Sequence, residues 1–460
     1  MKVKELYLRH CHHFTELPLK LNPVEQPVTI ILGAQASGKT AVLKNIYHAL
    51  SWFSARYKDL RTAGIVMLDS EIKHTFTQSK IRIAVQYPPD LGILDQNHSP
   101  AEGEEALCRW KLLKTMTNKG VGYSTAETGD LEHLVGLYQK AIQTDPTQGL
   151  PMIAYYPSDR FINEINLLSK NNPAVLQTQA AYEFAPLPYT TFARFFEWFR
   201  EISDIENARF SQMYQKLASH KSAPDPTGTS PDLKDSLTLR LLNLETDIQL
   251  PSLKALKTAL HTVFPQLSDI YIEYSPKLQL MLRYQNQEIP FTQLSNSLKQ
   301  WVCLVGDIVR RLCILNPHSI SPCTEGEGIL LIDNIDAQVD SDFQQSILDR
   351  LHQAFPQLQM IVSACSKDIL ENEVNYQYFH LIQQRIFEID IARAQAEFEE
   401  AYQHILTDHD MPAAEPAIGQ TEPLSNSQRL FQRFKDLSEA EQQQFMQLIQ
   451  DDDFKSPSPI

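Results

Sequence analysis

Apolar residues along the chain follow two spacings, one typical of strands and one typical of helices. They alternate with polar residues over residues 3–20, which predicts two short strands around a turn. Runs that predict further strands occur at residues 28–32, 64–68, 80–87, 150–156, 268–274, 278–284, 328–332 and 358–363. Helical spacing occurs at residues 41–60, 131–142, 251–264, 294–315 and 343–354. Strands that alternate with helices indicate an α/β core with a parallel sheet.

The remaining segments are less regular. Residues 161–250 are expected to be largely helical, with a loop rich in proline, glycine and serine at 222–229. The aromatic residues within 192–210 are interpreted as the buried face of a helix rather than as a surface for stacking bases. Residues 89–147 are polar and mixed, and only the helix at 131–142 is predicted there. A charged helix is expected at 391–406.

A glycine-rich sequence lies between the apolar run at 28–32 and the helix that follows it. Gly33-Ala34-Gln35-Ala36-Ser37-Gly38-Lys39-Thr40 fits the phosphate-binding pattern G-x-x-x-x-G-K-[ST]. Its glycines let the backbone fold around phosphate oxygens, and its amides and the helix N-terminus supply hydrogen-bond donors. Lys39 is expected to reach the β- and γ-phosphates of ATP, and Thr40 to bind Mg²⁺.

A second strand supplies the carboxylate that this chemistry requires. Residues 328–332 are apolar and end at Asp333, which we expect to hold Mg²⁺ together with Thr40. Because this strand lies about 300 residues after the phosphate-binding strand, a large helical insertion is expected between them. The two motifs together predict a binding site for ATP and Mg²⁺.

Composition limits the choice of partners. The chain has 460 residues, of which 43% are hydrophobic and 21% charged, and a net charge of 41 − 56 = −15. This charge argues against binding nucleic acid over the whole surface, but it leaves open a local basic groove on one face. The six cysteines show no metal-binding spacing, and no apolar leader or run of about 18 residues is found. A cytoplasmic protein without membrane contact is therefore expected.

Several further motifs lie at residues 155–160, 195–199, 264–265, 294–312, 316–317, 325–333 and 355–362. In these motifs the chain resembles the RecF/OLD-like AAA ATPases of the ABC superclass, and in particular the ATPase subunits of Septu-type and retron-associated anti-phage systems. The resemblance covers roughly residues 1–370. It implies an ABC-type P-loop ATPase head, with a mixed or parallel sheet flanked by helices, a helical insertion and a C-terminal helical extension.

The chain is accordingly expected to divide into six parts. These are the N-terminal half of the head at 1–160, the helical insertion at 161–265, the C-terminal half of the head at 266–390, a helical extension at 391–412, a linker at 413–423, and a C-terminal helix with an acidic tail at 424–460. The terminal helix is either a docking element for a partner or a helix that packs back on its own domain.

Two motifs depart from the family pattern next to the expected nucleotide. The family's Walker B aspartate is followed by a glutamate, whereas this chain has Asn334, whose amide holds a water but cannot accept its proton. The family's switch histidine is replaced by Cys365. Asp336 is an alternative base. The family's two histidines after Walker B are replaced by Gln338 and Asp340.

The signature motif departs as well. In the family, Leu-Ser-x-Gly of a second protomer contacts the γ-phosphate, and here the sequence is Leu294-Ser295-Asn296-Ser297. The resemblance implies that Ser295 and Asn296 meet the nucleotide of the partner. The side chain of Ser297, at the glycine position, obstructs close approach of the backbone.

These features favour an ATP-binding, hydrolysis-poor scaffold or sensor of an anti-phage defence complex. It is expected to form a homo-oligomer through its ATPase heads and to control an effector such as a nuclease. One alternative is a slow but active ABC-type ATPase that acts on DNA in repair or defence. Another is an interaction protein whose P-loop is a relic. Nucleic acid remains a candidate partner that the net charge does not indicate.

Overall fold

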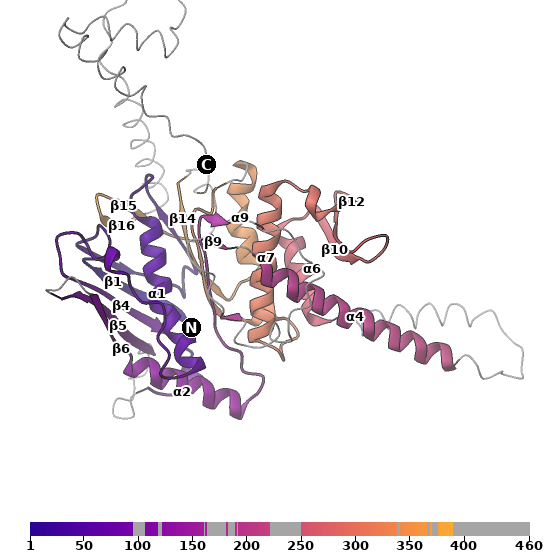
Figure 1. The fold of residues 1–460 in the computed structure, drawn as a ribbon, viewed down its shortest axis with the longest axis horizontal. Coiled ribbons are helices and arrows are strands. Elements are labelled where there is room, and N and C mark those ends of the chain that lie inside the picture. Colours follow the sequence, from indigo (N-terminus) through magenta and orange to yellow (C-terminus); the bar gives the residue numbers. More distant parts are fainter. Residues whose placement is uncertain are drawn as a thin grey trace, which may run out of the picture. The chain divides into compact units, whose positions relative to one another are not determined.

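The computed structural model describes part of the chain. The described residues are 1–94, 106–117, 122–160, 162, 181–182, 189–190, 192–220, 250–337, 341–365, 369 and 376–389. All of them lie in one compact unit, Met1–Glu400 (Figure 1). The predicted extension, linker and terminal helix after residue 390, most of the predicted insertion, and residues 338 and 340 lie outside the described residues.

A six-stranded sheet forms the centre of the fold. Its strands, in spatial order, are β16 (Arg385–Ile389), β15 (Gln377–Ile382), β3 (Val28–Leu32), β14 (Leu358–Ala364), β13 (Gly328–Ile332) and β7 (Met152–Tyr156). The strands from β15 to β7 run parallel, and β16 pairs antiparallel with β15. Every residue of β3, β7, β13 and β14 is buried, which explains why their sequences are mainly apolar. The predicted parallel core is therefore confirmed.

A five-stranded antiparallel sheet accompanies this core. Its spatial order is β2 (Glu16–Lys20), β1 (Lys2–Arg9), β4 (Gln78–Gln86), β5 (Leu107–Met116) and β6 (Gly122–Glu127). The strands β1, β2 and β4 were predicted, but β5 and β6 were missed. In β5, buried Cys108, Trp110 and Leu112 alternate with polar residues, so only one face is apolar. This alternation was not recognised as a strand, because residues 89–147 are polar as a whole.

Helix α1 (Lys39–Lys58) connects the two sheets. It contacts β4 of the antiparallel sheet and β7, β13 and β14 of the central sheet (Figure 1). Because both faces of the helix are covered, its middle, from Asn45 to Ala55, is entirely buried. Helix α2 (Gly129–Thr144) packs against α1 and β5. The P-loop therefore sits on an element that the fold holds on two sides.

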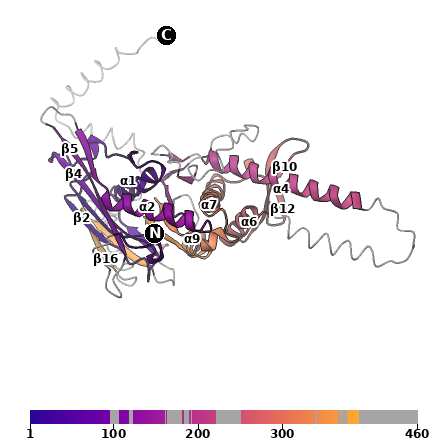
Figure 2. The same ribbon diagram turned by 90° about the horizontal axis from the view of Figure 1, so that it is seen from below.

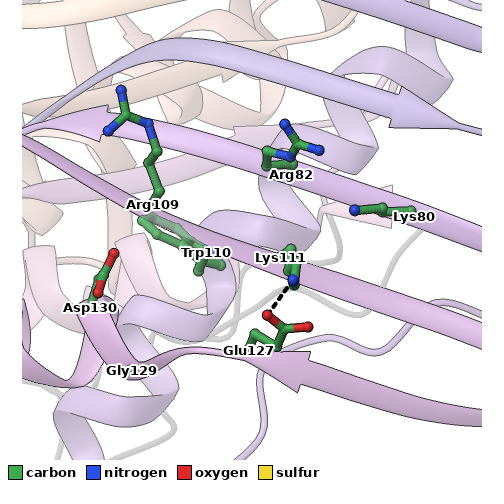
Figure 3. Close-up of a pocket in the computed structure, with 8 residues that line it drawn as sticks. All are labelled: Lys80, Arg82, Arg109, Trp110, Lys111, Glu127, Gly129 and Asp130. Atoms are coloured by element: carbon green, nitrogen blue, oxygen red, sulfur yellow. Dashed lines mark ion pairs between the residues drawn. The ribbon is translucent and has the colours of Figure 1, made fainter.

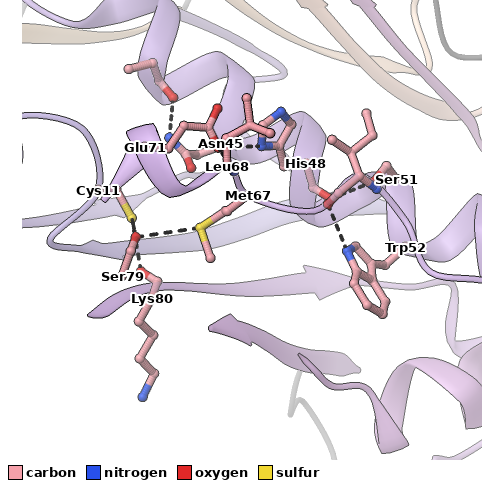
Figure 4. Close-up of polar contacts among 12 residues, drawn as sticks. Cys11, Asn45, His48, Ser51, Trp52, Met67, Leu68, Glu71, Ser79 and Lys80 are labelled. Atoms are coloured by element: carbon pink, nitrogen blue, oxygen red, sulfur yellow. Dashed lines mark hydrogen bonds and ion pairs between the residues drawn. The ribbon is translucent and has the colours of Figure 1, made fainter. Parts of the chain in front are cut away.

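The predicted strand at residues 64–68 is wrong. This segment is irregular and leads into a single 3₁₀ turn, η1 (Asp69–Glu71). Its backbone is hydrogen-bonded to side chains of α1: the Ile65 amide donates to Ser51 Oγ at 2.7 Å, and Trp52 Nε1 donates to the Ile65 carbonyl at 3.2 Å (Figure 4). These bonds satisfy the backbone groups that a neighbouring strand would otherwise use.

Helices and a small sheet form the other side of the unit. The helices are α4 (Ala193–His220), α6 (Pro251–Val263), α7 (Asn296–Leu315), α8 (Pro322–Glu325) and α9 (Ser341–Ala354). The small sheet contains β10 (Leu267–Glu273), β11 (Gln279–Tyr284) and β12 (Gln287–Pro290). Short elements are η2 (Pro89–Leu91), η4 (Phe291–Gln293), and the pair β8 (Asp159–Arg160) and β9 (Tyr189–Thr190). Helix α6 packs against α7 and α9, next to the parallel core (Figure 2).

The aromatic residues of α4 belong to this packing. Phe195, Phe196, Trp198 and Phe199 are buried, and Phe196 meets Phe291 edge to face. The interpretation as a core face is therefore confirmed for the aromatic residues of 192–199, whereas Phe210 is exposed. No helix among the described residues is long and apolar enough to cross a membrane. The described sheets and helices confirm the predicted α/β class, with a mixed sheet flanked by helices.

A buried charged cluster joins α7 to the central sheet. Both oxygens of Asp307 accept hydrogen bonds, one from Arg310 Nε and one from Arg311 Nε, each at 2.8 Å. The hydroxyl of Tyr156, at the end of β7, donates to Asp307 Oδ2 at 2.8 Å. Burial alone raises the pKa of Asp307, but the attraction of the two guanidinium groups outweighs it and holds the pKa well below its usual range.

Candidate functional site

A pocket opens where the P-loop leaves β3. Its volume is about 380 Å³, which lies in the range of small-molecule sites. It is lined mainly by the P-loop and the start of α1, with one contribution each from the β1–β2 turn, the end of β13 and the end of β14. The lining residues are His12, Gln35, Ala36, Ser37, Gly38, Lys39, Thr40, Ala41, Lys44, Asn334 and Cys365.

The P-loop backbone requires its second glycine. Gly38 has a φ of 108°, and a Cβ atom at this position would come within 2.3 Å of the His13 ring. Lys39 is buried at the start of α1, and its Nζ donates to the carbonyls of Gly33 at 2.6 Å and Ala34 at 3.0 Å. The ammonium group therefore lies inside the curve of the loop, where a phosphate-binding loop needs its positive charge.

Thr40 and Asp333 meet across the mouth of this loop. The Thr40 hydroxyl donates to Asp333 Oδ2 at 2.7 Å, although the two residues are 293 positions apart in sequence. The hydroxyl of Ser363, on β14, donates to the other oxygen, Oδ1, at 2.5 Å. Asp333 is completely buried. A hydroxyl and a carboxylate side by side at a P-loop are the oxygen ligands that Mg²⁺ prefers, so the residues present fit a Mg²⁺–nucleotide.

Arg160 holds the loop that carries Asp333. Its guanidinium group is buried and donates to the carbonyls of Pro157 at 3.1 Å, Asp333 at 2.9 Å and Asn334 at 3.3 Å. Sequence reasoning noted Arg160 only as part of a motif and gave it no role. Its partners are backbone carbonyls, which no residue pattern reveals. The side chain positions the end of β13 and does not line the pocket.

The structure places the residues at the degenerate catalytic positions in two different settings. Asn334 and Cys365 line the pocket, with Cys365 Sγ 4.0 Å from Asn334 Oδ1. Asn334 has a φ of 46°, a conformation that asparagine adopts more readily than most residues. Asp336 does not line the pocket, and its Oδ2 accepts a hydrogen bond from the Cys365 amide at 2.6 Å. Its carboxylate is thus engaged in holding the end of β14.

The signature residues lie apart from the P-loop pocket of the same chain. Ser295 is the N-cap of α7, and its Oγ accepts a hydrogen bond from the Leu298 amide at 3.2 Å. Asn296 begins the helix, and neither residue lines the pocket. A contact of Ser295 and Asn296 with nucleotide therefore requires a second copy of the chain, and it stays a prediction.

The turn between β1 and β2 supplies pocket residues that sequence reasoning missed. His12 lines the pocket, and His13 Nε2 donates to the Ser37 carbonyl at 3.0 Å. Lys44 lines the pocket from α1. Two adjacent histidines that interrupt an alternating hairpin just before a P-loop were the available signal. The hairpin therefore closes one side of the pocket and fixes the loop at Ser37.

Acidification is expected to destabilise the protein through His12. Burial, and then the positive charges of Lys44 and His13, lowers the pKa of His12 from 6.5 to about 4. Between these values the unfolded chain binds a proton that the folded chain does not, so the free energy of unfolding falls as the pH drops. Allowing for partial exposure of the ring, the loss from pH 7 to pH 5 is about 1 kcal/mol. Urea unfolding at both pH values measures it.

A matched pair of variants assigns this effect. His12→Asn removes the titrating ring, and asparagine tolerates the φ of 52° at this position. This variant should lose about 1 kcal/mol less than the wild type on acidification. His318→Asn, at an exposed position, should behave as the wild type does. An unchanged pH dependence in His12→Asn would contradict the assignment.

The fold and the pocket together define an α/β protein with a phosphate-binding P-loop site. The chain is similar to two retron proteins. It is 24% identical over 397 residues to the retron Ec83 probable ATPase of Escherichia coli, covering 80% of this chain and 69% of that protein. It is 26% identical over 389 residues to the retron Vc95 probable ATPase of Vibrio cholerae serotype O1 biovar El Tor, covering 78% and 72%. The resemblance to retron-associated ATPases is thereby confirmed.

Two further comparisons complete this picture. No family model matches the chain. Among solved structures, the SMC head bound to the C-winged helix domain of ScpA is 13% identical with a TM-score of 0.44, covering 86% of this chain and 100% of that chain. The SMC head domain from Thermotoga maritima is 13% identical with a TM-score of 0.39, covering 85% and 100%.

Proposed function

We propose that this protein binds ATP and Mg²⁺ in the P-loop pocket, hydrolyses ATP poorly, and serves as a scaffold or sensor subunit of an anti-phage defence complex. The observation that carries the proposal is the contact of Thr40 with Asp333 at 2.7 Å beside the enclosed Lys39 ammonium. This is the part of a P-loop site that binds phosphate and metal. Similarity to the retron probable ATPases supports the defence context.

Poor hydrolysis is inferred from the residues at the pocket mouth. Asn334 and Cys365 stand where a base and a histidine donor are expected, and neither an amide nor a thiol replaces those groups well. Loss of one such group typically costs about 10²–10⁴ in rate. Asp336 is engaged with the Cys365 amide, so it is a poor substitute for the missing base.

ATP that is bound but not cleaved has a thermodynamic role. A nucleotide that binds only the assembled state adds its binding free energy to that state and shifts the population toward it. In the proposed assembly, Ser295 and Asn296 at the start of α7 reach the nucleotide of a second head. The resulting homo-oligomer, placed in the cytoplasm, would control an effector such as a nuclease.

The nucleotide retained during purification tests this proposal. We expect ATP rather than ADP in the protein purified with Mg²⁺, measured by chromatography after denaturation. Added ATP should turn over no faster with the wild type than with Asp333→Ala, because the catalytic groups are absent. Turnover that Asp333→Ala abolishes would favour the slow but active ATPase. Absence of ATP and of ATPγS binding by calorimetry would favour the relic P-loop.

A further inference from the structure

The outward face of the antiparallel sheet carries a cluster of positive charge that shares no residue with the P-loop pocket. Lys80 and Arg82 project from β4, and Arg109 and Lys111 project from β5 (Figure 3). We call these four residues the basic face. They line an open pocket of about 390 Å³ together with two carboxylates, Glu127 and Asp130.

The alternation of side chains along β4 and β5 places these four charged residues on one face of the sheet. In β4 the residues next to Lys80 and Arg82 are buried, namely Ser79, Ile81 and Ile83. Side chains of a strand alternate between its faces, so the charged residues all point away from the core. The ladder places Arg82 directly opposite Lys111. Cations that are paired across strands in this way repel one another unless an anion lies over them.

The charge of this face is unlike that of the chain. Four cations and two carboxylates line the pocket, 4 − 2 = +2, whereas the whole chain has a net charge of −15. Lys111 pairs with Glu127. Within the part of the chain that the structure describes, no carboxylate forms an ion pair with Lys80, Arg82 or Arg109. Among the described residues, Lys111 alone of the four cations is therefore ion-paired, and it would exchange Glu127 for a bound anion.

Two details support a prearranged site. The Arg82 guanidinium lies over the Tyr7 ring, 5.2 Å from its centroid, which holds it at the surface. Partial burial, together with the charges of Arg82 and Lys111, lowers the pKa of Lys80. A cation whose neighbours disfavour its charge gains from binding an anion, because the anion relieves that repulsion.

We propose that the basic face binds the phosphodiester backbone of a nucleic acid. Residues two apart on one strand stand about 6.6 Å apart, a spacing comparable to that of successive phosphates along a nucleic-acid strand. A polyanion that spans β4 and β5 contacts all four cations and releases its condensed counterions. The net charge of the chain did not exclude a local basic groove, and the basic face is the proposed position of that groove.

The neighbouring aromatic residue indicates how this contact works. Trp110 is only 2% exposed, and its Nε1 donates to the Ala49 carbonyl of α1 at 3.0 Å. Its ring therefore cannot serve as a platform for stacking bases. Contacts through phosphates alone carry little sequence information, so binding should depend on salt and hardly on sequence.

The same residue disfavours an acidic protein as the partner. The core of a protein–protein interface is apolar, with a polar rim around it. The basic face offers charged side chains, and its large apolar side chain, Trp110, is buried and faces α1. A flexible, highly charged backbone fits such a surface better than a folded partner with an apolar core.

Fluorescence anisotropy with labelled 30-nucleotide probes tests the proposal on the full chain. Single-stranded DNA, duplex DNA and single-stranded RNA distinguish the sources of the backbone, and labelled polyglutamate is the acidic-polypeptide probe. With four phosphate contacts, the slope of log K against log salt should be about −3 for a single strand and about −3.6 for a duplex. Affinity should then fall about 50-fold to 150-fold between 50 and 200 mM salt.

Matched charge variants locate the binding. Arg82→Gln with Arg109→Gln should weaken nucleic-acid binding by at least about 10-fold, and Arg82→Lys with Arg109→Lys should retain most of it. Lys277→Gln with Arg283→Gln removes the same charge at the exposed β10–β11 hairpin, and it should change binding by less than about 2-fold. Unaltered thermal unfolding of each variant verifies its fold.

Several outcomes would overturn the proposal. These are equal losses in the two glutamine pairs, no nucleic-acid binding by the wild type at 50 mM salt, or polyglutamate binding as tightly as DNA and RNA. The P-loop proposal is tested separately, because Arg82→Gln with Arg109→Gln should bind ATPγS as the wild type does. Lys39→Ala should in turn keep its affinity for the nucleic-acid probes.

Discussion

Replacement of Asp307 by alanine is expected to lower the free energy of unfolding by about 3–5 kcal/mol, because it leaves two buried guanidinium groups without their shared carboxylate. Arg310 is 1% exposed, and both Arg310 and Arg311 donate to Asp307 at 2.8 Å. The Tyr156 hydroxyl loses its acceptor in the same step. Urea unfolding followed by circular dichroism measures the change in midpoint and slope.

An exposed ion pair provides the control for this prediction. Arg283 and Glu288 are 3.0 Å apart on neighbouring strands, with about half of each side chain exposed. Glu288→Ala should therefore cost less than about 1 kcal/mol. If Asp307→Ala cost no more than Glu288→Ala, the buried cluster would not stabilise the junction of α7 with β7. A large loss in both variants would point to a general effect of removing acidic residues.

The cluster matters for the site because of where it sits. Tyr156 ends β7, and the ladder pairs it with Ile332, the residue before Asp333. The Asp333 amide also donates to the Tyr156 carbonyl at 2.9 Å. Helix α7 begins at Asn296, next to Ser295. One buried network thus ties the helix that starts after Ser295 to the strand beside Asp333, the proposed Mg²⁺ ligand.

The central sheet could be predicted because its strands are buried on both faces. Residues 328–332 are apolar throughout and residues 28–32 are apolar except for Thr29, and short runs of this kind next to turn residues favour buried strands. The antiparallel sheet was harder to predict, since one face of β5 meets water and carries charge, and β6 is exposed over most of its length. Residues 64–68 show the opposite error: Met67 is buried without a strand partner, while Val66 and Leu68 are exposed.

Some residues of the candidate site could also be predicted from the sequence, and others could not. Thr40 and Asp333 were found from sequence because each ends a motif with a fixed spacing, and the structure brings them into hydrogen-bond contact. Ser363 and His12 were not found, since their importance comes from strand order and from the path of the β1–β2 turn. Order in the sheet, with β14 between β3 and β13, is a property that no local pattern records.

The second large effect is expected from Lys39→Ala, which should weaken ATPγS–Mg²⁺ binding by about 100-fold. Lys39 is 5% exposed and its ammonium group lies inside the loop, so its loss removes a charge-assisted hydrogen bond from a partly dehydrated site. A loss of about 2–3 kcal/mol corresponds to this factor. Titration calorimetry with ATPγS and Mg²⁺ measures it directly.

Two comparisons make this result specific to the P-loop. Lys254→Ala removes the same side chain from an exposed position of α6 and should leave the affinity within about 2-fold of the wild type. Thr40→Ala should weaken binding in Mg²⁺ more than in EDTA, because the hydroxyl beside Asp333 acts through the metal. Equal affinities for the wild type and Lys39→Ala would show that nucleotide binds elsewhere. Hydrolysis is expected to be negligible, so ATP should stay bound and stabilise the nucleotide-bound state of the protein. In Lys39→Ala this stabilisation should fall in proportion to the affinity that is lost.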